Sequence, residues 1–261
     1  MATAIPIGDT MNGGRTSAPA PRDPQLIGQT VVVVGGSAGI GLETARLARV
    51  EGAEVILTGR NPDRLKAAAS AVGALRTAAF DANNSEALHQ FFEALSAPVD
   101  HILVTAGGPK YGPLLEMDIA DVREALSGHA TLGLQVARNA RPKMRPGGTL
   151  LLMGGTGGRR IDHRLGIVSA ATAVLPPFTA ALALELAPIR VNLIAAGFVD
   201  TPLSATLLGD QIDNRRDELT STLPIGRVVT PEDVARLALH LMVNTALTGG
   251  TYDIDGGQQF V

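Results

Sequence analysis

Three glycines near the N-terminus have the spacing and surroundings of a phosphate-binding turn. Gly35, Gly39 and Gly41 follow four consecutive valines and precede a stretch with apolar residues at helical spacing. Glycine permits a sharp turn and a close backbone approach, and the N-terminus of the next helix offers free N–H groups with a partial positive charge. The pattern predicts a site for the diphosphate of a dinucleotide, formed by Gly35, Ser37, Gly39, Ile40 and Gly41.

A second chemical signal follows the next strand-like segment. Dinucleotide sites that take NAD place a carboxylate about 20 residues beyond the glycines, where it accepts hydrogen bonds from the ribose. Here Gly59 stands at that position and Arg60 follows it. A carboxylate would repel a 2′-phosphate, whereas an arginine pairs with it through a charge-assisted fork. We therefore predict NADP as the cofactor, with Arg60 on the 2′-phosphate and Ser37 and Asn61 as helpers.

The elements that must position these groups alternate regularly along the chain. Strand-like segments are 31–34, 54–58, 75–80, 99–105, 148–153, 190–195 and 251–255. Helical patterns occupy 43–51, 63–72, 85–95, 118–141, 167–187 and 231–243. This alternation predicts an α/β fold, a Rossmann-like doubly wound parallel sheet of about seven strands with helices on both faces. Ligands of such sheets bind at the carboxyl ends of the strands.

One domain accounts for most of the chain. Residues 1–25 contain four prolines and a glycine pair without hydrophobic periodicity, which predicts a flexible N-terminal extension. Residues 26–261 are expected to form a single NADP-binding domain. The hypothesis that the extension covers a neighbouring subunit stays open beside plain disorder.

Composition excludes several classes of function. The 261 residues carry a net charge of −3 without long charged runs, which argues against nucleic acid or anionic membrane as a partner. The chain has no cysteine, and its five histidines lack metal-ligand spacing, so we expect no disulfide, thiol nucleophile or metal site. We also expect no apolar run of membrane-spanning length, and a cytoplasmic location.

These motifs together resemble the short-chain dehydrogenase/reductase family from about Gly28 to Gly257. The turn is Gly-x-x-x-Gly-Ile-Gly, with Val34 in place of the family's threonine. Further matching segments are Val104–Gly107, Ala196–Pro202, Pro224–Arg227, Pro231–Ala235 and Asp255–Gly257. The resemblance implies that Asp81 binds the adenine amino group, that Ala106 and Gly107 line the cofactor, and that the Val199 backbone and Thr201 hydroxyl hold the nicotinamide carboxamide.

The resemblance fails at the family's four catalytic positions. Members use a tyrosine, a lysine four residues later on the same helix face, a serine and an asparagine. Aligned on flanking segments, these positions hold Val168, Thr172, Gly155 and about His129. A valine has no proton to transfer, so this chain is identified as an atypical member that lacks the Asn-Ser-Tyr-Lys set. The loss is on the order of 10²–10⁴-fold if no other group replaces it.

Other groups near the expected nicotinamide end are candidates for proton transfer. They are Lys110, Tyr111, Thr156 and His163. A histidine oriented by a carboxylate, as Asp162 would orient His163, can act as a general acid near neutral pH. The arginine-rich loop around His163 could equally bind an anionic ligand or form a solvated turn.

Three functions remain open at this point. The first is an NADP(H)-dependent oxidoreductase that acts on a carbonyl or alcohol substrate with a non-standard proton donor. The second is a catalytically silent NADP(H)-binding sensor or regulatory protein. The third is a lyase or isomerase that keeps the fold and uses the arginine-rich loop.

The helix expected to carry the catalytic pair contains two prolines. Pro176 and Pro177 should kink or interrupt the predicted helix 167–187 near Leu175, because proline removes a hydrogen bond and clashes with the preceding turn. Family members pair through this helix and the one predicted over 118–141. The resemblance therefore implies a homo-oligomer, a tetramer before a dimer.

Overall fold

The protein is built on one parallel sheet. A computed structural model describes residues 25–159, 161 and 165–261. It contains a seven-stranded sheet with the order β3-β2-β1-β4-β5-β6-β7, and every neighbouring pair of strands is parallel. The strands are β1 (Thr30–Val34), β2 (Glu54–Gly59), β3 (Arg76–Ala79), β4 (Val99–Val104), β5 (Met144–Gly155), β6 (Arg190–Ala196) and β7 (Thr251–Ile254). The predicted fold class is confirmed.

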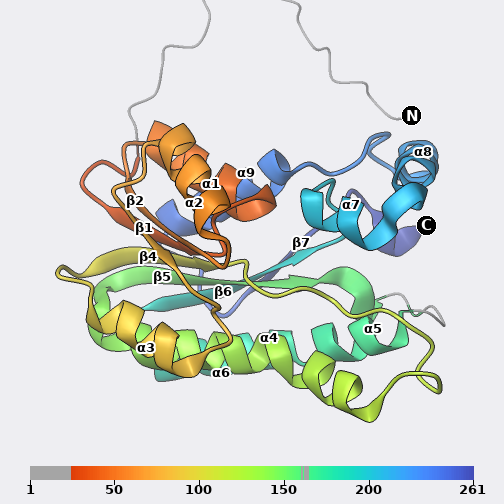
Figure 1. Ribbon diagram of the computed structural model, residues 1–261, viewed down its shortest axis with the longest axis horizontal. Coiled ribbons are helices and arrows are strands. Elements are labelled where there is room, and N and C mark those ends of the chain that lie inside the picture. The colour runs from red at the N-terminus through yellow and green to blue at the C-terminus, as the bar shows by residue number, and fades with distance from the viewer. Residues whose placement is uncertain (1–24, 160, 162–164) are drawn as a thin grey trace, which may run out of the picture.

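Helices cover both faces of the sheet. Figure 1 shows α1, α2 and α9 on one face and α3, α4, α5 and α6 on the other, while α7 and α8 lie at one end. The helices are α1 (Gly39–Val50), α2 (Pro62–Val72), α3 (Ser85–Glu93), α4 (Ile119–Ala140), α5 (Gly166–Ala173), α6 (Leu175–Glu185), α7 (Pro202–Leu208), α8 (Ile212–Thr222) and α9 (Pro231–Val243). Except for Gln25, the predicted N-terminal extension lies outside the described residues.

The valine strand explains how the two layers share one sheet. Side chains alternate between the faces of a strand. Val31 and Val33 pack in the core under α1 and α9, whereas Val32 and Val34 pack in the core with α3 and α4. All four side chains are fully buried. The continuous apolar run therefore serves both cores, as expected for a parallel strand covered on both sides.

The sequence patterns missed two helices and shortened one strand. Helices α7 and α8 lie between the predicted strand 190–195 and the predicted helix 231–243, where no element was expected. Helix α8 is mostly polar and exposed, so it carries little of the apolar periodicity on which helix prediction depends. Strand β5 begins at Met144 rather than Gly148, because Met144 pairs with Val99 before a register irregularity.

The predicted break near Leu175 is confirmed. Helix α5 ends at Ala173 and α6 begins at Leu175, with Pro176 and Pro177 in its first turn. Proline is tolerated there because first-turn N–H groups have no partner within the helix. The two prolines thus start a new helix instead of disrupting an existing one.

The expectation that no apolar run reaches membrane-spanning length is wrong. The stretch Gly166–Glu185 has 20 residues and a mean hydropathy of 1.8, which satisfies that test by length and composition. In the structure the stretch is the α5–α6 pair of the layer against the sheet, and Leu175, Leu182 and Ala183 belong to the core. Burial against β5 and β6 accounts for this part of its apolar character.

A buried cation joins β6 to the C-terminal end of α9. Arg190 is 6% exposed, and its guanidinium donates to the carbonyl oxygens of Leu241 at 2.8 Å and Met242 at 2.7 Å. The partial negative charge of a helix C-terminus suits this cation. His101 on β4 is also buried, and its Nε2 lies 2.6 Å from the Gln29 side-chain oxygen. Burial, with the Arg190 charge as a second cause, lowers the pKa of His101 to about 4.

This histidine predicts a specific loss of stability in mild acid. The folded state keeps His101 neutral, whereas the unfolded chain binds a proton near its ordinary pKa of 6.5. Stability is therefore fully present above pH 6.5 and falls as the pH drops toward 4. The contribution lost between pH 7 and pH 5 is about 2 kcal/mol.

Urea unfolding at these two pH values tests the effect. His101→Gln keeps a donor toward Gln29 and should lower the difference in unfolding free energy between pH 7 and pH 5 by about 2 kcal/mol. His89→Gln, at an exposed histidine, is the control and should leave the difference unchanged. An identical pH dependence in the parent protein and His101→Gln would contradict the assignment.

Candidate functional site

The turn between β1 and α1 is packed too tightly at Gly35 and Gly41 for any residue but glycine. Gly35 has a φ of +101°, and a β-carbon on it would lie 2.6 Å from the backbone nitrogen of Ala106. A β-carbon on Gly41 would lie 2.5 Å from the carbonyl oxygen of Gly35. The amide of Gly36 donates to the Thr58 carbonyl at 2.9 Å, which ties the turn to β2. Because Gly35 and Gly41 have no side chains, the carboxyl ends of β1, β2 and β4 can approach one another closely here.

The N-terminus of α1 is left open toward an anion. Its N-cap, Ala38, makes no side-chain capping bond, and the first turn contains no acidic residue. Gly39 is half-buried but less crowded than Gly35 and Gly41: the nearest atoms to a β-carbon there would belong to Thr201, at 3.4 Å, and Pro202, at 4.0 Å. Ile40 follows it in the first turn. Free N–H groups and the helix dipole make this end suitable for a diphosphate.

Thr105 is a positioning residue that the sequence analysis missed. Its hydroxyl lies 3.0 Å from the Gly35 carbonyl oxygen and 3.3 Å from that of Val34. The backbone amides of Thr105 and Ala106 both donate to the Val34 carbonyl, at 2.8 and 2.9 Å. The sequence carries one sign of this role, because Thr105 is the first polar residue after the buried strand β4. Thr105 fixes the end of β4 against the glycine turn.

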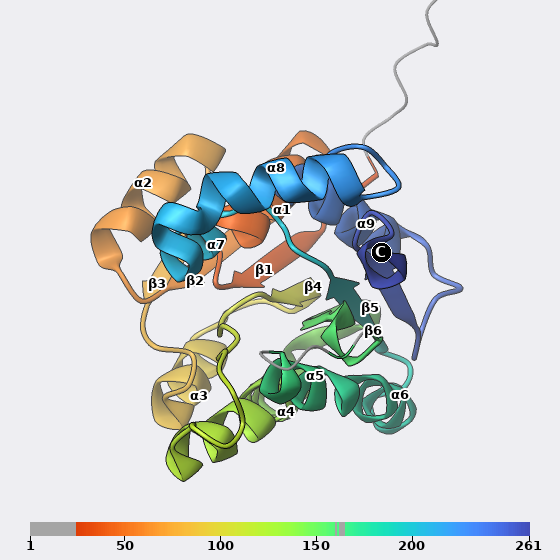
Figure 2. The same ribbon diagram turned by 90° about the vertical axis from the view of Figure 1, so that its right-hand side faces the viewer.

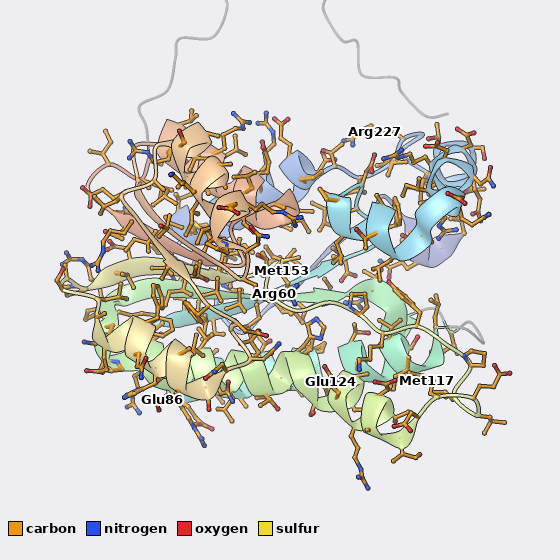
Figure 3. The ribbon with its side chains drawn as sticks, viewed as in Figure 1. Arg60, Glu86, Met117, Glu124, Met153 and Arg227 are labelled. Carbon is orange, nitrogen blue, oxygen red and sulfur yellow. The ribbon has the colours of Figure 1, made fainter. Side chains whose placement is uncertain are left out.

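The end of β2 has the arrangement predicted for a 2′-phosphate. A β-carbon on Gly59 would lie 3.1 Å from the Ser37 hydroxyl oxygen, so Ser37 fills the place beside Gly59. Arg60 is exposed, and among the described residues its guanidinium has no hydrogen bond or ion pair. Figure 3 labels Arg60 near the middle of the molecule, between the two helical layers. The Ser37 hydroxyl and the Arg60 guanidinium thus lie next to residue 59, which carries no carboxylate.

Two further predicted cofactor residues have local structural roles. The Asn61 side-chain oxygen accepts from the Arg64 amide at 2.9 Å and caps α2, which leaves the Asn61 amide nitrogen available. Asp81 follows β3 and accepts from the Asn83 amide at 3.0 Å in an exposed turn. Both lie beyond the carboxyl ends of their strands, at the same edge of the sheet as the glycine turn.

The segment after β6 closes the site from the other side. Val199 is buried and pairs with Val229 in an isolated parallel bridge. Thr201 caps α7 by accepting from the Ser204 amide at 3.1 Å. The Thr201 side chain would lie 3.4 Å from a β-carbon on Gly39. Of the two predicted residues, Thr201 therefore lies near the glycine turn, and Val199 is buried in the core two residues before it.

The aligned catalytic positions form one cluster at the ends of β5 and α5. A β-carbon on Gly155 would lie 3.3 Å from Thr172 Cγ2, and one on Gly157 would lie 3.4 Å from Val168 Cγ1. The Thr172 hydroxyl donates to its own helix, with the Val168 carbonyl 2.8 Å away. Buried Ser169 donates to the Gly157 carbonyl at 2.7 Å and holds the loop to α5. The cluster contains methyl groups and glycines where a proton donor would stand.

The predicted substitutes for that donor occupy different places. The Lys110 ammonium lies 2.5 Å from carboxylate oxygens of both Asp121 and Glu124, hydrogen bonds that raise its pKa. Tyr111 is 52% exposed on the same loop, and Thr156 is buried beside the cluster. His163 lies outside the described residues, as does Asp162. Figure 3 labels Glu124 on the α4 side of the molecule.

His129 is a further group at the site. Its Nε2 would lie 3.8 Å from a β-carbon on Gly107, so the ring faces the loop after β4. Burial lowers the pKa of His129, and the imidazole is therefore neutral at pH 7. Among the described residues it has no hydrogen-bond partner. A neutral imidazole can still donate one hydrogen bond.

The surroundings of the site are apolar. Leu203 on α7 lies 3.9 Å from a β-carbon on Gly108, and Leu114 lies 2.9 Å from one on Gly166. These side chains are about half exposed, and Tyr111 and Leu207 are exposed nearby in sequence. The site thus combines a helix end suited to an anion, the exposed Arg60 and an aliphatic wall. This combination suits a dinucleotide with a partly apolar second ligand.

Comparisons with known proteins agree with this arrangement. The model of the family described as enoyl-(acyl carrier protein) reductase matches residues 34–259. Carbonyl reductase family member 4 of Xenopus tropicalis is 30% identical over 234 residues, which cover 87% of this chain and 96% of the relative. The 3-oxoacyl-(acyl-carrier-protein) reductase FabG of Aquifex aeolicus is 31% identical over 249 residues, which cover 89% and 98%.

Solved structures show the same fold. A small-chain dehydrogenase in complex with NADPH has a TM-score of 0.76 and 26% identity, with 89% of this chain and 99% of that chain covered. BdcA in complex with NADPH has a TM-score of 0.79 and 28% identity, with 89% and 95% covered. Matches of this extent in sequence and fold establish that the chain belongs to the short-chain dehydrogenase/reductase family of oxidoreductases.

Proposed function

We propose that this protein is an NADP(H)-dependent oxidoreductase that acts on a carbonyl or alcohol group with a non-standard proton donor. The observation that carries the cofactor choice is the end of β2, where Ser37 stands against Gly59 and the Arg60 guanidinium has no ion pair or hydrogen bond with any residue that the structure describes. A carboxylate on residue 59 would be forced against Ser37 and would repel a 2′-phosphate. The NADPH bound in two structural relatives supports this choice.

The residues present fit a dinucleotide along its length. The first turn of α1 would hold the diphosphate, because Gly39 leaves its backbone open and no acid competes. Asp81 would accept from the adenine amino group. Val199 and Thr201 would hold the nicotinamide end, with Ala106 and Gly107 beneath it. When bound, NADPH supplies a hydride to the substrate carbon.

The proton is the unusual part of the proposed reaction. Reduction of a carbonyl needs a proton for the oxygen, and Val168, Thr172 and Gly155 offer none: the Thr172 hydroxyl already donates within α5. Lys110 is held by two carboxylates. Tyr111, Thr156 and His163 remain the proposed donors, and His129 joins them as a neutral N–H group. Ordinary ketones should therefore react slowly or not at all.

The substrate is proposed to be a small molecule with an apolar part. Names of the relatives point to carbonyl and acyl-carrier reductases, and aliphatic side chains flank the site at Leu203 and Leu114. The oligomer is proposed to be a tetramer before a dimer, built on α4 and the α5–α6 pair. Exposed Leu126, Val174 and Leu184 on these helices support such a contact.

Cofactor choice is tested by binding titrations. NADP(H) should bind at least tenfold tighter than NAD(H), which corresponds to about 1.4 kcal/mol. Arg60→Ala should remove most of the difference, since it removes the cation that pairs with the 2′-phosphate. Arg76→Ala, an exposed arginine at the amino end of β3, is the control and should leave it intact. Equal affinities for NADP(H) and NAD(H) in the unmutated protein would contradict the proposed preference for NADP(H).

The loss of the proton donor is tested by restoring it. Val168→Tyr, Thr172→Lys and Gly155→Ser together should create measurable NADPH-dependent ketone reduction. The control variant carries Val168→Phe with the same Thr172→Lys and Gly155→Ser changes. It keeps the aromatic ring but lacks the hydroxyl. Activity should differ between the two by 10²-fold or more.

Two results would count against this account of the donor. One is a phenylalanine control as active as the tyrosine variant. The other is an unmodified protein that already reduces simple ketones at ordinary rates, of order 1–10³ s⁻¹. In the second case Tyr111, Thr156, His129 and His163 are the residues to replace first.

The oligomer is tested by light scattering at micromolar concentration, where a tetramer is expected. Leu184→Asp places a charge at a leucine that is 83% exposed on α6, and it should shift the mass toward smaller species. Val50→Asp, at a residue 65% exposed at the end of α1, is the control and should not. A monomeric mass for the unmodified protein would contradict the proposal.

A further inference from the structure

Helices α7 and α8 cover the carboxyl end of the sheet with little apolar anchoring. Figure 2 shows them lying across that end, in front of β1 and α1. No residue of α7 is buried, and α8 buries only Leu219. Apolar burial is the main stabilising contribution to docking of a surface helix. Polar contacts must therefore do much of the positioning of α8.

One arginine makes the cross-element contact. Arg216 on α8 donates to Asp200 through two nitrogens, Nε to Oδ2 at 3.0 Å and Nη2 to Oδ1 at 2.8 Å. Its Nη1 donates to Asp213 one helical turn earlier, at 2.7 Å. Within the part of the chain that the structure describes, the two Arg216–Asp200 bonds are the only side-chain hydrogen bonds that join α8 to a residue outside the α7–α8 segment.

The paired fork makes this contact stronger than an ordinary surface ion pair. Isolated exposed pairs contribute little, but a bidentate arginine–carboxylate pair has two parallel hydrogen bonds and a defined geometry. With Asp213 bonded to the third nitrogen, all three guanidinium nitrogens of Arg216 are bonded to carboxylates. The side chains of Arg216 and Asp200 are 39% and 34% exposed, so salt screens the pair only in part.

Asp200 lies inside the segment that faces the cofactor turn. Its amide donates to the Val229 carbonyl at 3.0 Å, and it separates Val199 from Thr201. Thr201 in turn contacts the glycine turn at Gly39. Helix α8 is thus connected to the place where the dinucleotide would lie through the Arg216–Asp200 pair and the peptide unit between Asp200 and Thr201.

We propose that Arg216 is a positioning residue that couples the docking of α8 to retention of the cofactor. The inference rests on the proposed binding of NADP(H). With the Arg216–Asp200 pair formed, the segment from Val199 to Thr201 is held against the bound nucleotide and α8 covers the exit. Breaking the pair frees α8 and lets the nucleotide leave faster. By thermodynamic linkage, the bound cofactor must stabilise the docked α8 to the same extent.

Stopped-flow displacement of NADPH, followed by its fluorescence, tests the coupling. Arg216→Gln should raise the dissociation rate about tenfold with a smaller change in the association rate. Arg215→Gln is the matched control, because the one ion pair of Arg215 among the described residues is with Glu218 on its own helix. It should leave the rate within about twofold of the parent. Equal rates for the parent and Arg216→Gln would overturn the proposal.

A mutant cycle and hydrogen exchange separate coupling from general destabilisation. Asp200→Asn should match Arg216→Gln, and the double variant should be no faster than either single variant. NADPH should slow amide exchange in α8 of the parent and of Arg215→Gln, but not of Arg216→Gln. Additive effects, or equal protection in all three proteins, would overturn the coupling. Absence of NADPH binding to the parent would instead refute the proposed function.

Discussion

The close approach of backbone at the end of β1 is the constraint on which the site depends. A β-carbon on Gly35 would clash with the backbone nitrogen of Ala106, and one on Gly41 would clash with the carbonyl oxygen of Gly35. Thr105 fixes this contact with its hydroxyl and amide. Because the strands are parallel, their carboxyl ends lie at one edge, and β1 and β4 are neighbours where the strand order reverses. The anion-binding end of α1 is therefore placed where loops from β2, β4, β5 and β6 can reach it.

The two halves of the site differ in chemical character. The cofactor side has the open N-terminus of α1, the Ser37 hydroxyl and Arg60, whose guanidinium has no partner in the described part of the chain. The substrate side has an apolar cluster at Val168 and Gly155, and the Thr172 hydroxyl there is committed to its own helix. In the proposed function, the first half binds the dinucleotide and the proton comes from a group other than these aligned residues. This division is why binding and turnover must be measured separately.

Sequence patterns predicted the scaffold better than the contacts across the site. The valine run, the glycine spacing and Pro176–Pro177 are local signals, and they correctly predicted β1, the turn and the break between α5 and α6. Helix α8 escaped prediction because it is held by Arg216 rather than by an apolar face. Thr105 was missed as a site residue because its importance depends on Gly35, which is distant in sequence. His129 was aligned with the family's asparagine but not named as a proton donor, because its place beside Gly107 depends on the fold.

The most direct test of the central claim is a crystal structure of the protein with NADP⁺. The account predicts the diphosphate on the first turn of α1, the 2′-phosphate within hydrogen-bond distance of Arg60, and the nicotinamide ring next to Val168 and Gly155. No acidic or basic side chain should replace the missing phenol at Val168. A nucleotide bound elsewhere, or a 2′-phosphate directed away from Arg60, would contradict the account.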